Sequence, residues 1–537
     1  MKSKRIQLLA PGTLSVLLLV SACSGGGTPS ATSPAASGSA AVSSKPSSSA
    51  TPAERPKISV LSYNLAGNTP NVSNWNENIY VKKLEELTGT DLEFEFLNAA
   101  DYSTQLTLRF ASNELKDLIA TTGIDSPAHP NAVKQGAFLQ LNDLIDKYGP
   151  NLKAKIPEKV WKSPQVSVDG KIYAIPLLSP HSELGALYIR QDWLKKLNMP
   201  MPKTLDDWLA YFEKVKVEDM DGDGDPNNEY GFEVRENFSS SAEFFYQFGV
   251  ALDYWVMQDG QFVPSVITPK MKDALAFWRM MYKNGYIPPN SFTNKLADWQ
   301  AAIYKDKAGS WLHFVDNAAT WWAPSNFSNP NADPVIVEPP LGPGGQGTYP
   351  ETTGLYRVWV IPSKEKNPER LIKFLDFVWG SPEVQKFFTF GIEGYNYDMV
   401  DGKVKWDITS PNNAKNEENL LYMYNMNFSG VSRNNDEQIK LNPFAPKLIK
   451  GYEIAEKYKI KSEAMYMPVM EAFKTRPELL PNFGSGNTLL MEMFAKVITS
   501  NVDIDAEFDK FVKEWKSRGG DEAIKQATAW HKQFYGN

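Results

Sequence analysis

The stretch KISVLSYN at residues 57–64 starts the folded part of the chain, and the alternation of elements that begins with it decides the fold. It predicts a strand, because apolar and polar residues alternate in it. The segment NIYVKKLEELTG at 78–89 is amphipathic with a helical period and closes on Gly89, whereas DLEFEFLN at 91–98 alternates like a strand again. Strand-like and helix-like runs continue to alternate along the chain. This alternation predicts an α/β fold.

The length of the chain and its charge bound its class. A chain of 537 residues is too long for one small core, which predicts two or more domains. Lysine and arginine total 56 residues against 63 acidic residues, so the net charge is -7. Because binding to nucleic-acid phosphates needs a basic surface that releases counterions, we expect no nucleic-acid partner.

The first residues have the features of an export signal. A basic start, MKSKR, precedes an apolar run that ends in VLLLV and then VSAC at 20–23. Apolar, small, small, cysteine is the lipobox of bacterial lipoproteins. It predicts a signal peptide at 1–22 and a lipid anchor, such as palmitate, on Cys23. We therefore expect the protein on the extracellular face of the cell membrane.

Residues 23–56 predict a disordered tether. They are nearly all Ser, Ala, Pro, Thr and Gly, a composition that cannot bury enough apolar surface to fold. Such a tether would hold the folded part away from the membrane. Cys23 is the only cysteine in the chain, so disulfides and C-x-x-C sites are excluded.

The acidic stretch DMDGDGDPNNEYG at 219–231 has the spacing of a calcium loop. With Asp219 at loop position 1, Asp221 and Asp223 fall at positions 3 and 5, and Gly224 falls at position 6, where an EF-hand needs glycine. A hard cation that takes many oxygens suits such a cluster, so calcium is favoured over magnesium or zinc. A solvated acidic turn is the alternative. The predicted calcium ligands are Asp219, Asp221, Asp223, Asp225, Asn228 and Glu229.

The same stretch departs from an EF-hand in three respects. Glu229 stands at position 11 instead of 12, and Pro226 has no N–H for the pairing of two EF loops. Upstream a helix is predicted, with Thr204 as its cap and Asp207 completing a capping box. Downstream, YGFEVRE at 230–236 alternates like a strand. A helix-loop-strand site has no helix pair to open, so we expect a structural role for calcium.

No catalytic motif is recognisable in the sequence. The four histidines lie far apart, and neither a G-x-S-x-G elbow nor a G-x-x-x-x-G-K-[ST] phosphate loop occurs. One G-x-G-x-x-G, at 342–347, follows two prolines and lacks the strand and helix that a dinucleotide site requires. Glycoside hydrolysis needs only two carboxylates at a suitable separation, so that class stays open. We expect a binding protein rather than an enzyme.

Seven segments, taken together and in their order along the chain, indicate a protein family. They are VSAC, GAFLQLNDLIDKYGPNLK from Gly136, DGKIYAIP from Asp169, LYIRQDWLKKLNMPMPKTLDDW from Leu187, GSW from Gly309, GIEGYNY from Gly391 and WKSRGGDEAI near the end. The ordered set resembles the extracellular solute-binding proteins of ABC sugar importers, in particular their large lipoprotein subfamily. The resemblance extends over essentially all of the chain after the tether.

The resemblance implies a type II periplasmic-binding-protein fold, with two α/β lobes around a ligand cleft. The lobes would comprise 57–182 with 341–395 and 183–340 with 396–537, joined by crossings near 180–183, 338–341 and 394–397. Closure of the lobes on the ligand would be the signal to the permease subunits of an ABC importer. We expect the protein to be a monomer.

Sugar binding requires flat rings and hydrogen-bonding side chains at the lobe edges. The predicted contacts lie where loops should face the cleft, and they are Trp75, Glu183, Trp255, Trp311, Asp316, Trp321, Trp322, Tyr395 and Tyr397. Glu183 and Asp316 are the expected acceptors for sugar hydroxyls. Core packing is the alternative for each tryptophan. Trp193 and Trp208 lie on apolar helix faces, so we expect both in the core.

The predicted function rests on these features taken together. We expect a lipid-anchored protein that captures a carbohydrate, specifically an oligosaccharide, in an aromatic-lined cleft and delivers it to an ABC importer. The alternatives are a surface glycoside hydrolase that uses two cleft carboxylates and a binding protein for peptides.

Overall fold

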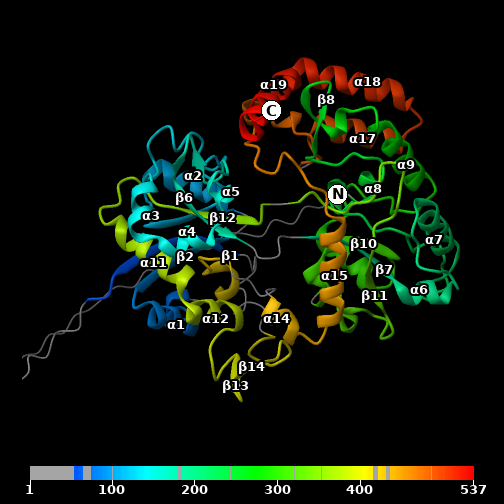
Figure 1. Ribbon diagram of the computed structural model, residues 1–537. Coiled ribbons are helices and arrows are strands. Elements are labelled where there is room, and N and C mark those ends of the chain that lie inside the picture. The colour runs from blue at the N-terminus through cyan, green and yellow to red at the C-terminus, as the bar shows by residue number, and fades with distance from the viewer. Residues whose placement is uncertain are drawn as a thin grey trace, which may run out of the picture. The chain divides into compact units, whose positions relative to one another are not determined.

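Two β-sheets, each with its own helices, organise the chain (Figure 1). The computed structural model describes residues 54–64, 74–98, 101–178, 184–241, 243–319, 321–351, 353–414, 421–430, 436–484 and 486–536. Within these ranges, the larger sheet has the strand order β2-β1-β3-β12-β6 and the smaller sheet has the order β10-β7-β11. The remaining strands of the described ranges form two-stranded hairpins.

The strands are short and fall into these groups. The larger sheet contains β1 (Lys57–Asn64), β2 (Asp91–Asn98), β3 (Leu118–Thr121), β6 (Ala174–Leu178) and β12 (Leu355–Val360). The smaller sheet contains β7 (Gly185–Arg190), β10 (Ser310–Phe314) and β11 (Pro334–Val337). The hairpins pair β4 (Ser167–Val168) with β5 (Lys171–Ile172), β8 (Trp255–Gln258) with β9 (Gln261–Pro264), and β13 (Tyr397–Val400) with β14 (Lys403–Trp406).

Helices separate the strands along the chain, as the alternating pattern predicts. Those that accompany the larger sheet are α1 (Ile79–Thr88), α2 (Tyr102–Ser112), α3 (Asn142–Tyr148), α4 (Pro150–Lys155), α5 (Glu158–Trp161), α11 (Pro368–Gly380) and α12 (Pro382–Phe390). The others are α6 (Gln191–Lys196), α7 (Leu205–Val217), α8 (Glu243–Tyr246), α9 (Met271–Lys283), α10 (Leu296–Tyr304), α14 (Asp436–Leu441), α15 (Ala445–Tyr458), α16 (Glu471–Thr475), α17 (Leu489–Thr499), α18 (Ile504–Trp515) and α19 (Asp521–Tyr535).

The larger sheet is covered on both faces. Successive side chains of a strand point to opposite faces. Val60 accordingly packs in one buried cluster with residues of α1, α4, α11 and α12, whereas Leu61 packs in another with residues of α2. On β12, Trp359 belongs to the first cluster and Val358 to the second. Strand β12 thus returns to a sheet that was begun about 300 residues earlier (Figure 1).

The smaller sheet is also buried on both faces. Every residue of β7 is buried, and its side chains divide by position. Leu187 and Ile189 pack in the largest apolar cluster, whereas Ala186 and Tyr188 pack in a second one with Trp311. Trp193 and Trp208 lie in the largest cluster with 2% and 0% of their surface exposed, which confirms their predicted place in the core.

The segment that contains the π-helical turn Leu421–Asn425 packs differently from the lobe division drawn from the sequence. Leu421, Tyr422 and Phe428 lie in the cluster of the larger sheet, although 396–537 was assigned to the second lobe. Among the residues that the structure describes after Phe428, Ile439 packs in the cluster beside the smaller sheet. The lobe boundaries and the positions of the crossings stay a prediction.

Two local predictions on either side of the acidic stretch have different outcomes. Helix α7 has the predicted capping box: the N–H of Asp207 donates to the Thr204 hydroxyl at 3.2 Å, and the Thr204 N–H donates to the Asp207 carboxylate at 2.9 Å. The strand predicted at 230–236 is wrong, because this segment makes only single bridges to β10 and the residues before it.

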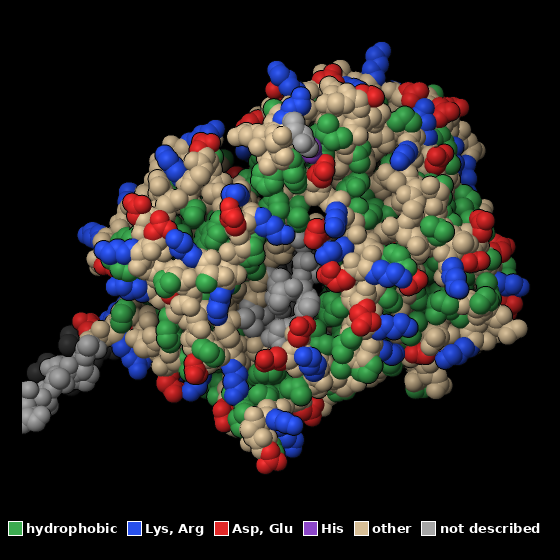
Figure 2. Space-filling view, in the orientation of Figure 1, with side chains coloured by type: hydrophobic (Ala, Val, Ile, Leu, Met, Phe, Trp, Pro, Cys, Tyr) green, Lys and Arg blue, Asp and Glu red, His purple; other side chains and the backbone are tan. Residues whose placement is uncertain are grey.

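The charge on the surface bears on a nucleic-acid partner, and the length and hydropathy of the helices bear on a membrane span. Acidic and basic side chains are interspersed on the face shown in Figure 2, without a broad basic area. This agrees with the net charge of -7. Among the residues that the structure describes, no helix is both long enough and apolar enough to cross a bilayer.

Candidate functional site

The carboxyl ends of four strands lie at one edge of the larger sheet, which is named the strand-end edge below. β1 is parallel to β2 and β3, and β12 is antiparallel to both β3 and β6, so β1, β2, β3 and β6 end at the same edge. Ligands of open α/β sheets bind outside this edge. The segments 65–73, 99–100 and 179–183, which follow three of these strands, lie outside the described residues, and with them the predicted contact Glu183.

The segment after β3 is described, and it is polar. The Thr122 hydroxyl donates to the Ser126 hydroxyl at 3.1 Å, and Asp125, which precedes Ser126 in the chain, is half-buried. Burial raises the pKa of Asp125, and the charge of Lys474 on α16 lowers it in part. The strand-end edge therefore presents hydroxyl and carboxyl groups, which suit a ligand rich in hydroxyls.

A second polar and aromatic group, the Asp253 group, was missed in the sequence. It consists of Tyr246, Asp253, Tyr254, Tyr349 and Asn482. The side-chain amide of Asn482 donates to both oxygens of Asp253, at 2.8 and 3.0 Å. Asp253 is exposed to solvent at the surface, whereas desolvation by its neighbours raises the pKa of its carboxylate to about 6 and the hydrogen bonds from Asn482 lower this pKa in part. Burial raises the pKa of Tyr246 strongly, with further contributions from Tyr349 and Asp253.

No short motif marks the Asp253 group, because Asn482 comes 229 residues after Asp253. In the segment ALDYW at 251–255, only Trp255 was predicted to contact the ligand. One local signal was present: Asp253 has a left-handed backbone (φ 56°), which aspartate tolerates at turns. A turn residue beside two aromatic rings would have been a reasonable candidate.

Three predicted sugar contacts lie in the core. Trp255, Trp311 and Trp322 have 4%, 0% and 1% of their surface exposed. Trp311 stacks on Tyr188 with the ring centroids 5.6 Å apart and the planes 3° from parallel. Its alternation along β10 turns it inward, and Trp322 packs against it at 5.1 Å. A ring without an exposed face cannot stack on a sugar, so these positions correct the sequence-based assignment of all three.

Asp316 and Trp321 lie beside this cluster and are partly exposed. The Trp321 ring stacks on the His313 ring, with centroids 5.0 Å apart and planes 23° from parallel. Burial lowers the pKa of His313 to about 3, so the ring beneath Trp321 is neutral. Trp321 therefore has one ring face supported from within the protein, which suits a platform for a sugar.

Trp75, Tyr395 and Tyr397 take different positions around the larger sheet. Trp75, just before α1, is half-buried and lies edge-on to Phe96 with centroids 5.6 Å apart. Tyr395 is half-buried and packs edge-on to Tyr80. Tyr397 is 8% exposed and packs against Phe390 in the small core of the β13–β14 hairpin. Trp75 and Tyr395 retain accessible surface, and Tyr397 has little.

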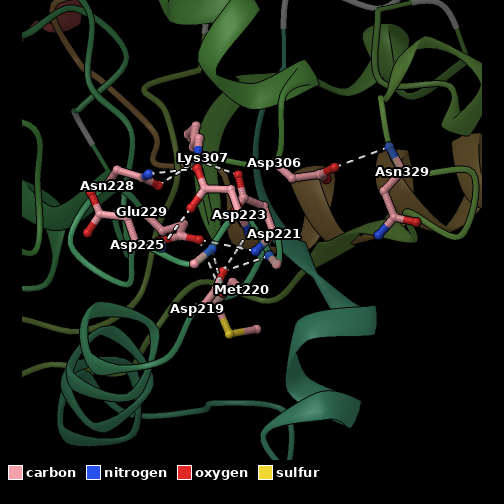
Figure 3. A network of polar contacts seen from close by, with 12 residues as sticks. Asp219, Met220, Asp221, Asp223, Asp225, Asn228, Glu229, Asp306, Lys307 and Asn329 are labelled. Atoms are coloured by element: carbon pink, nitrogen blue, oxygen red, sulfur yellow. Dashed lines mark hydrogen bonds and ion pairs between the residues drawn. The ribbon is translucent and has the colours of Figure 1, made fainter.

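The acid loop, residues 219–229, brings three of the six predicted metal ligands together (Figure 3). One carboxylate oxygen from each of Asp219, Asp221 and Asp223 lies within 4.8 Å of the others. The Asp219 carboxylate accepts from the N–H groups of Gly222 and Gly224, at 2.6 and 2.9 Å. Backbone donors thus orient Asp219 toward the middle of the loop. The loop could hold a metal ion through these oxygens.

The other three predicted ligands differ in orientation. Asp225 accepts from the backbone and side chain of Asn227, at 3.0 and 3.1 Å, and is turned toward that residue. The Asn228 amide donates to Asp223 at 2.9 Å, which places it at the border of the cluster. Glu229, unlike Asp225 and Asn228, is buried.

Glu229 is 1% exposed and lies beneath the loop. One of its oxygens accepts from the N–H groups of Met220 and Asp221, at 3.0 and 3.1 Å. The other oxygen is buried and has no hydrogen-bond partner within the part of the chain that the structure describes. Burial raises the pKa of Glu229 and the Asp221 side chain raises it further, whereas the Asp221 backbone N–H and the charge of Lys307 lower it in part. A buried carboxylate oxygen without a donor is a group that a cation could satisfy.

Lys307, from the segment between α10 and β10, reaches into the acid loop (Figure 3). Its ammonium forms ion pairs with Asp221 and with Asp223, the latter at 2.7 Å, and donates to the Asn228 side chain at 2.5 Å. Burial would lower the pKa of Lys307, but the two carboxylates outweigh it and raise the pKa. Lys307 therefore supplies the carboxylates of the loop with a positive charge from the protein itself.

Comparison with known proteins identifies the family of the chain. A family model described as bacterial extracellular solute-binding protein matches residues 66–386, which is more than half of the chain. The chain belongs to the bacterial extracellular solute-binding proteins. The family resemblance seen in the ordered sequence segments is thereby confirmed.

Two curated relatives of this solute-binding protein align over long stretches. It is 27% identical to lipoprotein LipO of Bacillus subtilis (strain 168) over 470 residues, which are 83% of this chain and 87% of LipO. It is 29% identical over 320 residues to the fructooligosaccharide ABC transporter substrate-binding protein FusA of Streptococcus pneumoniae serotype 4. That alignment spans 56% of this chain and 57% of FusA.

A solved structure confirms the predicted fold class of this solute-binding protein. The structure of an EF-hand mutant of S. pneumoniae FusA in complex with fructo-nystose is similar with a TM-score of 0.69 and 21% sequence identity, over 90% of this chain and 100% of the other. The type II α/β fold with two lobes was thus predictable. The family and these neighbours are extracellular binding proteins rather than enzymes.

Proposed function

We propose that this solute-binding protein captures an oligosaccharide outside the cell and delivers it to the permease subunits of an ABC importer. The observation that carries the proposal is the alignment of 320 residues with a relative named for fructooligosaccharide transport. The polar strand-end edge after β3 and the partly exposed rings support it, because sugars bind through hydroxyl hydrogen bonds and ring stacking.

The proposed ligand contacts combine predicted and newly found residues. Trp75, Asp316, Trp321 and Tyr395 stay in the proposal, since each keeps accessible surface. Glu183 stays as an acceptor for sugar hydroxyls at the proposed hinge. Asp253 and Tyr254 are added, because the Asp253 carboxylate is reached by solvent and lies beside several tyrosine rings. The buried Trp255, Trp311, Trp322 and Tyr397 act through packing.

The mechanism proposed is closure of two lobes without covalent chemistry. Each sheet has its own buried clusters, so each lobe can move as a unit. Ligand contacts from both lobes would stabilise the closed form, and the closed form would be the one that the permease accepts. The protein would act as a monomer, held at the extracellular face of the cell membrane by the lipid on Cys23 and the tether at 23–56.

The acid loop is proposed to bind calcium in a structural role. The oxygens of Asp219, Asp221 and Asp223 and the buried carboxylate of Glu229 fit a hard cation. The EF-hand named for the FusA neighbour is consistent with this assignment. Because α7 precedes the loop and no helix follows it directly, a bound ion would hold the loop against β10 instead of opening a helix pair.

A glycan screen followed by calorimetry tests the proposed function. The purified full-length protein, kept soluble in detergent, is expected to bind one class of oligosaccharide saturably and to release no new reducing ends from it. Release of reducing ends would instead favour the glycoside hydrolase. Tight binding of a peptide, with no glycan bound, would favour the peptide-binding alternative.

A further inference from the structure

The ammonium of Lys307 occupies the position where a cation would neutralise the acid loop. It contacts side chains from three positions of the loop, Asp221, Asp223 and Asn228. Two of these are members of the carboxylate cluster that could hold a metal ion. A metal ion that bound these same oxygens would therefore have to displace the lysine ammonium.

Lys307 is held in this position by its backbone. The N–H of Tyr230, directly after the loop, donates to the Lys307 carbonyl at 2.9 Å. The preceding residue, Asp306, is fixed by an ion pair with the fully buried Arg190. The Lys307 side chain is 23% exposed, so most of its stem is packed. The lysine is therefore a fixed part of the loop and not a freely moving surface chain.

The charge of the loop requires a cation. Asp219, Asp221, Asp223, Asp225 and Glu229 lie within eleven residues. Lys196 bonds only the backbone carbonyls of the loop, whereas Lys307 pairs with its carboxylates. In the described part of the chain, the ion pairs of the carboxylate cluster come from Lys307. Without this lysine, neighbouring carboxylates would repel one another at close range.

We propose that Lys307 is the resident cation of the acid loop: it holds the loop folded when no metal is bound, and a metal ion has to displace it. The displacement half of this statement rests on the calcium binding proposed above. Lys307 is then a determinant of metal affinity that lies 84 residues from Asp223 in sequence. Its competition weakens the affinity and makes the loop less dependent on metal for its fold.

Substitution of Lys307 separates its two roles. Lys307→Met removes the charge and keeps a flexible stem, and Lys305→Met, at an exposed lysine two residues earlier, is the matched control. Calorimetric titration with calcium chloride is expected to show about tenfold tighter binding to Lys307→Met than to the wild type, since a unit charge at this range is worth about 1 kcal/mol or more. With chelator present, Lys307→Met is expected to melt about 2 °C below the wild type, and Lys305→Met at the wild-type temperature.

The outcomes distinguish this proposal from the calcium proposal. Binding to Lys307→Met but not to the wild type supports the lysine as resident cation and contradicts calcium in the natural protein. Binding to neither overturns calcium and displacement together, and the melting temperature in chelator then decides whether Lys307 holds the loop. Equal calcium affinities and equal melting temperatures for the wild type and Lys307→Met would overturn the proposal.

A measurement on the wild type guards against a variant that fails to fold. Amine labelling with acetic anhydride, followed by peptide mass spectrometry, reports how accessible each lysine is. Calcium is expected to increase the labelling of Lys307 several-fold and to leave Lys305 unchanged. Labelling of Lys307 that stays constant or falls on addition of calcium, under conditions where calorimetry shows binding, would contradict displacement.

Discussion

Asp306 and Lys307 are neighbours in the chain, yet they belong to two ionic networks of opposite kind. Asp306 pairs with Arg190, which is fully buried and also binds Asp192 through two nitrogens at 2.6 and 2.9 Å. Lys307 pairs with Asp223 in the acid loop, where the carboxylate is 44% exposed. The Arg190 network is buried, whereas the acid loop is partly exposed to solvent.

The comparison shows what burial does to an ion pair. The Arg190 guanidinium contacts the rings of Trp193 and Phe327, at 4.9 and 5.4 Å to their centroids, and its side chain has no surface exposed to solvent ions. A buried charge that loses its partner costs several kcal/mol. At the surface, water and ions compensate a lost partner, and such pairs contribute little. The buried network is therefore fixed, and the exposed one can exchange its cation.

The largest expected effect comes from breaking the buried network. Arg190→Met leaves Asp192 and Asp306 without their cation and should lower the free energy of unfolding by about 3–5 kcal/mol. Urea unfolding followed by tryptophan fluorescence measures it. Lys195→Met is the matched control, because Lys195 pairs with Asp333 at 3.4 Å in an exposed position and should cost less than about 1 kcal/mol. Equal losses for the two variants would refute the comparison.

The same contrast applies to two adjacent tryptophans. Trp322→Ala empties a fully buried site and should cost about 3–5 kcal/mol of stability. Trp321→Ala, at a partly exposed ring, should change stability little and weaken glycan binding about tenfold, or about 1.4 kcal/mol. Thermal melting and calorimetry with the glycan from the screen measure the two effects. Unchanged glycan affinity in Trp321→Ala would remove this ring from the proposed site.

A buried carboxylate near β10 extends the comparison to pH. Glu233 is 1% exposed, and burial raises its pKa to about 8, above the ordinary 4.5. The fold therefore favours the protonated form, and the stability that it contributes is full below pH 4.5 and is lost as the pH rises toward 8. A pKa shift half as large would already change the free energy of unfolding by about 2 kcal/mol.

Glu233→Gln should remove this pH dependence. The variant is expected to match the wild type in urea unfolding at about pH 5 and to exceed its stability by about 2 kcal/mol at about pH 8. Its side chain keeps an acceptor for the Asn294 amide, which donates to Glu233 at 2.6 Å. A difference between the two proteins that stays constant across this pH range would contradict the raised pKa.

The smallest expected effect comes from the exposed loop. With calcium near 1 mM and a dissociation constant of about 10⁻⁴ M, binding adds about 1.4 kcal/mol to stability. Chelator should remove this gain in the wild type, and the double variant Asp219→Ala, Asp223→Ala should show no gain. Asp225→Ala is the control, since that carboxylate faces Asn227, and it should keep most of the gain. A gain that survives in the double variant would show that the ion binds elsewhere.

The sequence predicts features that depend on neighbouring residues. The capping box of α7 and the three-carboxylate cluster arise from spacings of two or three residues, and both are present. The fold class is indicated by alternation repeated along the chain. The sequence cannot show which face of a strand or loop is covered, so Trp311 and Trp321 were equal candidates although only Trp321 is partly exposed.

Contacts between distant residues were out of reach of any short motif. Lys307 meets Asp223 across 84 residues, and Asn482 meets Asp253 across 229. Tyr422 comes late in the sequence, and its packing beside the larger sheet was missed for the same reason. These pairings depend on how whole sheets and helices assemble, whereas local spacing fixes only the elements themselves.

The position of β12 has a consequence for the order in which the protein can fold. This strand lies between β3 and β6 in the larger sheet, and it ends at Val360. Until that residue has emerged, a chain made from its N-terminus leaves the facing edges of β3 and β6 unpaired. The first sheet to be synthesised therefore closes late, and more than half of the polypeptide has to be kept from aggregation before it does.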